Sequence, residues 1–543
     1  MMFASGTSIV LAKEPGDFMV SRLLRSTFST LWLFMMMLAL SACSDGRDDY
    51  EGNGGSGLPQ ADNPVVEGPV TGGGGPDCCV VKVVIDVDLR DQGYQPGTPF
   101  FSNVQFDLAE LGYQQSEYFI SGTAKSYINT SELDAAGNWS VAQADAADYR
   151  SRIAIARPIN PEDFNGTVIV EWFNNSGGLD AAPDWLALQT EIMRSGYVWV
   201  GVSAQRVGVQ GGGGAFDISL QDVDPVRYGS LFHPGDSFAY DIYSQAAQSV
   251  KNPVGLDPLE GLQVERMIGV GQSQSAFYLS TYVNAIHPTI DLFDGFLIHS
   301  RANYSAKLSQ EPQADISTPE NVFIRTDLTQ PVITLQAETD VFRLGSIAIR
   351  QADSDYFRLW EMAAAAHSDI YTTLKSPIDK GDDPALTDVT AVAEVRPPFI
   401  TCDVAANDGS ASWIAKAAMD ALNRWIRDGD AAASAPLLAV NPAGTDFVLD
   451  EHGNVEGGIR THYVDAPVAT FGGIGQGNEA FCGLFGTTVL FDQAKLNSLY
   501  PTNDDYVTAI NEAADAAVAA RFLLEADAAL IKARAPESGI GGP

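Results

Sequence analysis

The sequence predicts an α/β protein in which helices cover both faces of a mostly parallel central sheet. Two observations support this fold class. From about residue 115 the chain alternates strand-like and helix-like segments, and such alternation implies crossover connections between parallel strands. In the middle of the chain, the apolar run 267–270 is followed by a small polar turn, 271–275, and then by apolar residues spaced three and four apart. This pattern is typical of a buried strand, a tight turn and a helix.

The expected elements follow from apolar periodicity and from β-branched or aromatic content. The strands are expected at 119–120, 151–156, 167–173, 197–203, 267–270, 295–298, 331–336 and 357–360. The helices are expected at 185–193, 236–250 and 414–426, the last ending before Gly429, a typical C-cap residue. Sites in sheets of this kind lie at the carboxyl ends of the strands, where the segments after Val270 and Gln336 both begin.

The first 43 residues have the pattern of a bacterial lipoprotein leader. Arg22 and Arg25 precede an apolar run, 31–40, and Leu40-Ser41-Ala42-Cys43 matches a lipobox. We therefore expect residues 1–42 to be a signal segment, with Met19 as the start, and Cys43 to be lipidated. The apolar run is shorter than the about 20 residues that a spanning helix needs, although an uncleaved signal anchor is an alternative.

Residues 43–80 hold many Gly, Asp, Pro and Ser and few large apolar side chains. Such a stretch buries too little surface to offset chain entropy, which predicts a flexible tether. The remaining length, about 465 residues, is enough for one large domain with insertions or for two smaller domains.

The net charge of −37 argues against nucleic acid as a partner, because a phosphate backbone would be repelled. It also disfavours direct adsorption to anionic lipid. High acidity keeps a protein soluble, and we interpret it in that way.

Besides Cys43 the chain has four cysteines, which an exported protein can pair. Three pairings are possible, and the sequence does not choose among them. Cys78 and Cys79 would form a strained vicinal bridge, whereas Cys402 and Cys482 would staple a late loop to the C-terminal region. No Cys-x-x-Cys pair or His-Glu-x-x-His motif occurs, so we expect no structural zinc site, no catalytic metal and no cofactor.

The turn Gly271-Gln272-Ser273-Gln274-Ser275 resembles a nucleophile elbow. In that motif a sharp strand-to-helix turn presents the central serine, here Ser273, in a cleft. Ser275 stands where a glycine is usual, which leaves its effect on the turn open. The alternative interpretation is a serine- and glutamine-rich loop without a catalytic role.

A serine nucleophile needs a base, and the base needs an orienting acid. In α/β-hydrolases the chain order is serine, acid, histidine. Asp340 follows the expected strand 331–336 and is the predicted acid, with Glu338 as the alternate; His367 is the predicted base. His233, His287 and His299 precede the acid and are excluded by this order, while His452 and His462 are alternatives to His367. The competing interpretations are a surface-loop histidine and a turn aspartate.

Ester or amide hydrolysis also requires donors for the developing oxyanion. We expect one donor to be the backbone N–H of Gln274. The other is expected from the turn after strand 167–173, at the backbone of Asn175 or alternatively Asn174. An ordinary strand-to-helix turn would explain the glycines of this segment equally well.

Several segments resemble the bacterial alpha/beta hydrolase domain family, a family of largely uncharacterised serine hydrolases. The resemblance covers about residues 100–535 and lies in blocks such as FNGTVIVEWFNNSGGLD (164–180), GVGQSQSAFYL (269–279), QAETDV (336–341), RLWEMAAAAHSD (358–369) and CGLFGTT (482–488). It implies an α/β-hydrolase fold, with Ser273 as nucleophile and His367 as base. It places the acid in QAETDV without choosing between Glu338 and Asp340.

With this resemblance we expect an α/β-hydrolase catalytic domain at 81–430 with inserted cap segments. Residues 431–543 would be a C-terminal extension packed on the same domain, ending in a last helix formed by the amphipathic segment 507–522. The segments 300–330 and 370–400 are both irregular, and either could form the cap.

These features together predict a lipid-anchored carboxylic-ester hydrolase of the cell envelope, acting on a small-molecule or lipid ester. The location would be the outer membrane, facing the periplasm or the exterior, with the N-terminal lipid as the membrane contact. A serine peptidase or amidase with the same triad is one alternative. A non-catalytic envelope lipoprotein that retains the fold is another.

Overall fold

The computed structural model describes residues 84–85, 106–214, 218–381, 389–397, 402–477 and 482–541. The predicted leader, Cys43, the whole of the predicted tether (43–80) and the pair Cys78 and Cys79 within it lie outside the described residues. Within these ranges, no helix is long and apolar enough to cross a membrane.

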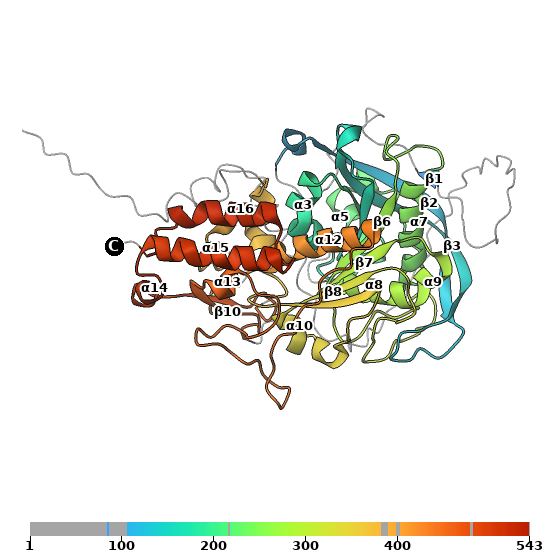
Figure 1. The fold of residues 1–543 in the computed structure, drawn as a ribbon. Helices are drawn as coiled ribbons and strands as arrows, with labels where there is room; N and C mark the ends of the chain where they lie inside the picture. The colour runs from blue at the N-terminus through green and yellow to red at the C-terminus, as the bar shows by residue number, and fades with distance from the viewer. Residues whose placement is uncertain are drawn as a thin grey trace, which may run out of the picture.

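A nine-stranded mixed sheet forms the centre of the structure, in the order β1-β2-β3-β5-β4-β6-β7-β8-β9 (Figure 1). The strands are β1 (Val84–Ile85), β2 (Tyr113–Asn129), β3 (Val141–Pro158), β4 (Thr167–Trp172), β5 (Val198–Val202), β6 (Arg266–Gln272), β7 (Gly295–His299), β8 (Val332–Ala337) and β9 (Phe357–Met362). From β5 to β9 all neighbouring strands are parallel, whereas β1, β2 and β3 pair antiparallel. The predicted mostly parallel α/β sheet is therefore confirmed.

Helices cover both faces of the parallel part of the sheet, which explains why its strands are apolar on both sides. Helix α7 (Ala239–Lys251) and helix α8 (Gln274–Thr281) pack on one face, in a cluster that includes Met267 and Phe296. Helix α3 (Pro183–Arg194) and helix α12 (Ala411–Asp428) pack on the other face, against Ile268 and Ile333. Helix α12 ends where predicted, because Gly429 adopts the left-handed conformation with φ +72°.

The shorter elements lie mostly in the connections. The helices are α4 (Arg206–Gln210), α5 (Leu220–Val223), α6 (Pro225–Tyr228), α9 (His287–Ile290) and α10 (Glu338–Phe342). Single turns of 3₁₀ helix occur at Leu108–Leu111, Pro161–Asp163, Asp236–Phe238, Ser346–Ile349, Ser376–Ile378 and Ala535–Glu537, and π-helical turns at Tyr282–Ile286 and Tyr371–Lys375. The predicted helix 236–250 is therefore a 3₁₀ turn followed by α7.

The segment after α12 packs on the loops that follow β8 and β9 (Figure 1). It contains α13 (His462–Asp465), the antiparallel pair β10 (Ala469–Gly472) and β11 (Thr487–Leu490), α14 (Gln493–Leu499), α15 (Asn503–Ala519) and α16 (Glu525–Arg534). One buried apolar cluster joins Val341 and Ala363 of the sheet-end loops to Phe471 and Ile510 of this segment. The C-terminal segment therefore shares a core with the end of the sheet where β8 and β9 finish.

The prediction of a last helix at 507–522 was wrong in its extent. Helix α15 begins at Asn503 and ends at Ala519, and α16 follows it. Phe522 lies in the connection, where its ring packs edge-on against Trp360 with centroids 5.0 Å apart. Phe522, which the sequence placed on the last helix, therefore packs against the sheet from a loop.

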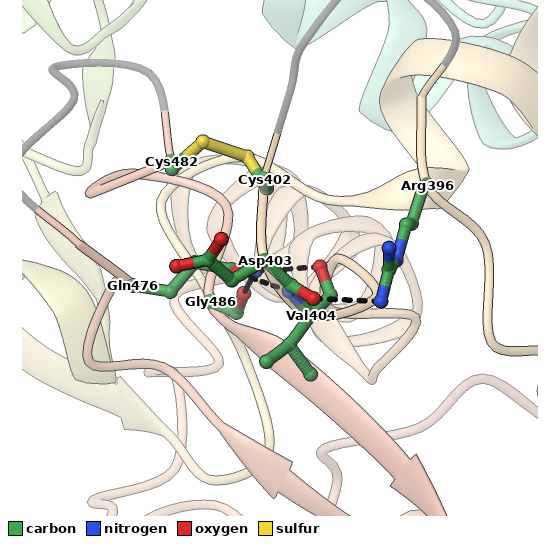
Figure 2. The surroundings of a disulfide bond; sticks show 7 residues. All are labelled: Arg396, Cys402, Asp403, Val404, Gln476, Cys482 and Gly486. Atoms are coloured by element: carbon green, nitrogen blue, oxygen red, sulfur yellow. Dashed lines mark hydrogen bonds between the residues drawn. A yellow bond between two sulfur atoms is a disulfide. The ribbon is translucent and has the colours of Figure 1, made fainter.

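A disulfide joins Cys402 to Cys482, which are 80 residues apart in the chain (Figure 2). The side chain of Gln476 lies beside it and bridges the two segments. It accepts from the backbone N–H of Val404 at 2.6 Å and donates to the carbonyl oxygens of Val404 and Gly486 at 2.9 and 3.0 Å. The disulfide thus closes a large loop at a place where hydrogen bonds already connect the same segments.

We expect the double variant Cys402→Ser/Cys482→Ser to lose about 2–4 kcal/mol of unfolding free energy, because it frees a long loop in the unfolded chain. Urea unfolding of oxidised wild type and variant measures this loss. The pair variant Cys78→Ser/Cys79→Ser controls for the removal of sulfur as such. Identical midpoints and slopes for wild type and the Cys402/Cys482 variant would contradict the expectation.

Candidate active site

The turn between β6 and α8 holds Ser273 in a strained backbone conformation. Its φ and ψ are +61° and −122°, a region that side-chain-bearing residues rarely adopt. A Cβ at Gly271 would lie 3.1 Å from the backbone of Ser275, a tight contact that favours glycine there. The hydroxyl of Ser275 accepts from the Gln272 N–H at 3.1 Å and donates to the Gln272 carbonyl at 2.8 Å. Serine at the last position of the motif therefore holds the turn together.

The structure brings Ser273, His367 and Asp340 into one hydrogen-bonded chain. The His367 Nε2 atom lies 2.8 Å from the Ser273 hydroxyl oxygen, and His367 Nδ1 lies 2.7 Å from Asp340 Oδ1. All three side chains are buried. With Nδ1–H donating to the carboxylate, Nε2 is left as an acceptor for the serine proton. Serine, acid and histidine come from the ends of β6 and β8 and from the loop after β9, in the predicted order.

The two residues before Asp340, Glu338 and Thr339, hold the backbone of the loop that carries His367. The carboxylate of Glu338 accepts from the backbone N–H groups of Ala364 and Gly473, both at 2.7 Å. Thr339 accepts from the His367 N–H at 3.0 Å and donates to the Gly473 carbonyl. Glu338, the alternate acid in the sequence analysis, is therefore bonded to backbone groups, and Asp340 is the carboxylate that contacts the imidazole.

Gln272, for which the sequence predicts no role, also fixes the position of His367. Its side-chain amide donates to the His367 carbonyl oxygen at 3.0 Å. The side chain lies at the end of β6, next to the serine, so strand and histidine loop are joined directly. A glutamine in the variable position of the motif gives no sequence signal for such a contact.

The turn after β4 lies against the elbow, and it distinguishes the two predicted asparagines. The Asn174 N–H donates to the Ala181 carbonyl at 2.9 Å, and its side chain donates to the Gln272 carbonyl at 3.0 Å. The Asn175 N–H faces the residue after the serine, because it donates to the side-chain oxygen of Gln274 at 3.2 Å. Asn175 is therefore the better placed of the two to supply an oxyanion donor.

A buried cluster of charged side chains holds this turn in place. The Asn175 side chain donates to Asp180 at 2.8 Å, and the same carboxylate receives Arg152 at 2.8 Å. Arg152 in turn pairs with Glu117 at 3.3 Å. These charged groups are nearly fully buried, and ion pairs in such surroundings tolerate little displacement. The backbone of the turn is accordingly fixed before any ligand binds.

The remaining candidate histidines lie away from this chain of contacts. His452 packs near Phe491 with ring centroids 5.8 Å apart, and His462 lies beside Tyr463 at 4.4 Å. Burial lowers the pKa of His462 to about 3, so it is neutral at physiological pH. Both belong to the C-terminal segment. In the described ranges no group of three or more His, Cys, Asp or Glu side chains could hold a metal ion.

Replacing Glu338 by alanine should weaken the folded state, because the buried N–H groups of Ala364 and Gly473 then lose their acceptors. We expect Glu338→Ala to cost about 1–3 kcal/mol of unfolding free energy. Burial raises the pKa of Glu338 from 4.5 to about 8, against the two backbone N–H groups that lower it. The folded wild type therefore retains a proton that the unfolded chain releases, and the associated stability is lost as the pH rises through about 8.

The advantage of wild type over Glu338→Ala should consequently shrink between about pH 5 and pH 8. Urea unfolding of both proteins at several pH values in this window measures the difference. An advantage that stays constant or grows with pH would contradict a raised pKa at this carboxyl.

None of the curated proteins searched matches the sequence. A crystal structure of a putative acetyl xylan esterase from Bacteroides fragilis NCTC 9343 shares 10% identity, with a TM-score of 0.23, over 46% of this chain and 67% of its own. A CE15 glucuronoyl esterase from Teredinibacter turnerae T7901 shares 12% identity, with a TM-score of 0.22, over 49% and 68%. The sequence model described as the alpha/beta hydrolase domain matches residues 66–533, and the chain belongs to that family.

Proposed function

We propose that this protein is a serine hydrolase of carboxylic esters, with Ser273 as nucleophile, His367 as general base and Asp340 as the orienting acid. The observation that carries the proposal is the continuous hydrogen-bonded chain from the strained serine through the imidazole to the carboxylate. Membership of an alpha/beta hydrolase family supports it.

In this mechanism His367 Nε2 takes the Ser273 proton as the hydroxyl oxygen attacks the ester carbonyl. Asp340 holds the ring in the required tautomer and stabilises the imidazolium. The backbone N–H groups of Gln274 and Asn175 would receive the negative oxygen of the tetrahedral intermediate, where one such donor is worth about 3–4 kcal/mol. The imidazolium then returns its proton to the departing alcohol, and water hydrolyses the acyl-enzyme by the same steps.

The proposal includes a location at the cell envelope through lipid on Cys43. It is supported by the lipobox and the Gly-rich tether in the sequence, and the family match begins at residue 66, beyond both the lipobox and Cys43. An enzyme held by such a tether would meet substrates near the membrane surface without inserting its own body.

We expect a fluorophosphonate probe to label the folded wild type, and Ser273→Ala and His367→Ala to abolish that labelling. A probe of this kind reports a nucleophilic serine without assuming a substrate. The Ser498→Ala variant, at an exposed serine on α14, controls for the loss of a hydroxyl group and should still label. A folded wild type that does not label would overturn the proposal. Faster turnover of aminoacyl anilides than of matched esters would replace the esterase with a peptidase or amidase.

Asp340→Asn should lower kcat by about 10³–10⁴-fold, because the amide cannot hold the imidazole in the tautomer that accepts the serine proton. Ester hydrolysis at saturating substrate measures this loss, with circular dichroism as the check on folding. Asp504→Asn, an exposed aspartate on α15, is the matched control and should keep the wild-type rate. A loss of less than about tenfold would argue for another acid.

A further inference from the structure

The position of the expected oxyanion donors is occupied by a side chain of the protein itself. The Gln274 side-chain carbonyl oxygen accepts from the Asn175 N–H at 3.2 Å. Gln274 is also the residue whose own N–H is the other expected donor, and its side chain is only partly buried. A substrate carbonyl that binds between these donors must therefore displace the Gln274 amide. The Gln274 amide oxygen thus occupies the place at the Asn175 N–H that the carbonyl oxygen of a bound ester would take.

The Gln274 amide is the first member of a polar chain that leads away from the serine. Its nitrogen donates to the Gln205 side-chain oxygen at 3.0 Å, which also accepts from the Trp172 indole at 3.2 Å. The Gln205 nitrogen donates to Asp236 Oδ2 at 3.3 Å. The chain therefore joins the oxyanion position to a carboxylate whose side chain is 20% exposed.

Among the described residues, the hydrogen bonds that Asp236 Oδ2 accepts are long, whereas Asp236 Oδ1 accepts from the Arg206 N–H at 2.7 Å. Besides Gln205, Oδ2 accepts from the Tyr278 hydroxyl at 3.4 Å, whereas hydroxyl groups usually approach a carboxylate to about 2.5–2.7 Å. The Tyr278 hydroxyl in turn accepts from the Gln310 amide at 2.9 Å. Gln310 belongs to the segment 300–330, one of the two candidate caps, so amide and carboxylate groups reach this side of the site from several elements.

We propose that Gln274 determines specificity and that the substrate is a neutral ester carrying hydroxyl groups beside its carbonyl. This inference rests on the proposed esterase function. The substrate carbonyl takes the place of the Gln274 amide at Asn175, and a substrate hydroxyl donates to Asp236 Oδ2. The carbonyl of a simple alkyl ester can also replace the Gln274 amide at Asn175. Such an ester has no hydroxyl group for the displaced amide or for Asp236, and leaving these polar groups without hydrogen bonds weakens its binding. The Asp236 carboxylate, in a chain of net charge −37, repels anionic esters.

Two matched substrate pairs test the proposal. Glycerol monoacetate against propyl acetate places the hydroxyls on the alcohol, and methyl glycerate against methyl propanoate places them on the acyl group. We expect wild type to favour the hydroxylated member of at least one pair in kcat/KM by more than about tenfold, since a hydrogen bond to the charged Asp236 carboxylate alone gives about that factor or more. Comparison of the two pairs shows whether Asp236 contacts the alcohol part or the acyl part of the ester.

Gln274→Met keeps the side-chain length but removes the hydrogen bond to Asn175. It should raise kcat/KM for propyl acetate by about fivefold and reduce the preference for the hydroxylated ester. Asp236→Asn, at a partly exposed position, should also reduce that preference, because an amide NH₂ cannot accept the substrate hydroxyl. Gln493→Ala, an exposed glutamine on α14, is the matched control and should keep the wild-type ratio.

A wild-type ratio near one in both pairs would overturn the inference, and so would an unchanged ratio in Gln274→Met and Asp236→Asn. Fluorophosphonate labelling distinguishes these results from failure of the proposed function. A labelled wild type without preference counts against Gln274 alone, whereas an unlabelled, folded wild type removes the esterase proposal and this inference with it.

Discussion

The placement of the His367 backbone is the constraint on which the rest of the site depends. An imidazole can serve Ser273 only if its loop stays at the sheet edge, and hydrogen bonds from Gln272, Glu338 and Thr339 hold it there. Two of these side chains come from the same turn that supplies Asp340. The turn after β8 therefore positions both the ring and the backbone that carries it. Buried contacts of this kind are costly to break, because each broken one leaves a polar group without water.

The C-terminal segment completes this support, so it is part of the site's architecture as well as of the core. The Gly473 N–H donates to the Glu338 carboxyl group, and the Gly473 carbonyl accepts from the Thr339 hydroxyl. A Cβ at Gly473 would lie 2.2 Å from the Cβ of Glu338, so the segment can approach this closely only with glycine there. The Ser368 N–H donates to the Leu484 carbonyl at 3.1 Å, two residues beyond the disulfide-bonded Cys482. The cross-link and the histidine loop are thus neighbours through one short stretch of chain.

Much of the fold and the order of the three candidate residues could be predicted from local patterns. The strand–turn–helix around Ser273 and the small-residue run before His367 are sequence-local, and so is the acid after β8. The sequence favours Asp340 over Glu338 as the acid by position alone, because both carboxylates lie on one turn and three-dimensional packing decides which of them faces the ring. The lengths of β2 and β3 were missed for a different reason. Their long antiparallel pairing extends through polar, half-exposed residues that carry no strong strand pattern.

Two buried acids, Glu171 and Asp184, connect the end of β4 and the start of α3 to the Ser273 backbone through His299. Glu171 at the end of β4 accepts from the N–H groups of Asp184 and Trp185 at 2.9 Å, which fixes the start of α3. Asp184 bonds His299 Nδ1 at 2.9 Å, and the His299 carbonyl accepts from the Ser273 N–H at 2.9 Å. Burial, with the charge of Asp184, raises the pKa of Glu171, so this carboxyl holds a proton more readily than an exposed one. A serine backbone held in such a hydrogen-bonded frame needs little rearrangement as charge develops, and preorganisation of this kind is a large part of electrostatic catalysis. The Gln274 side chain stands apart from this frame as the partly buried group that a ligand would have to move.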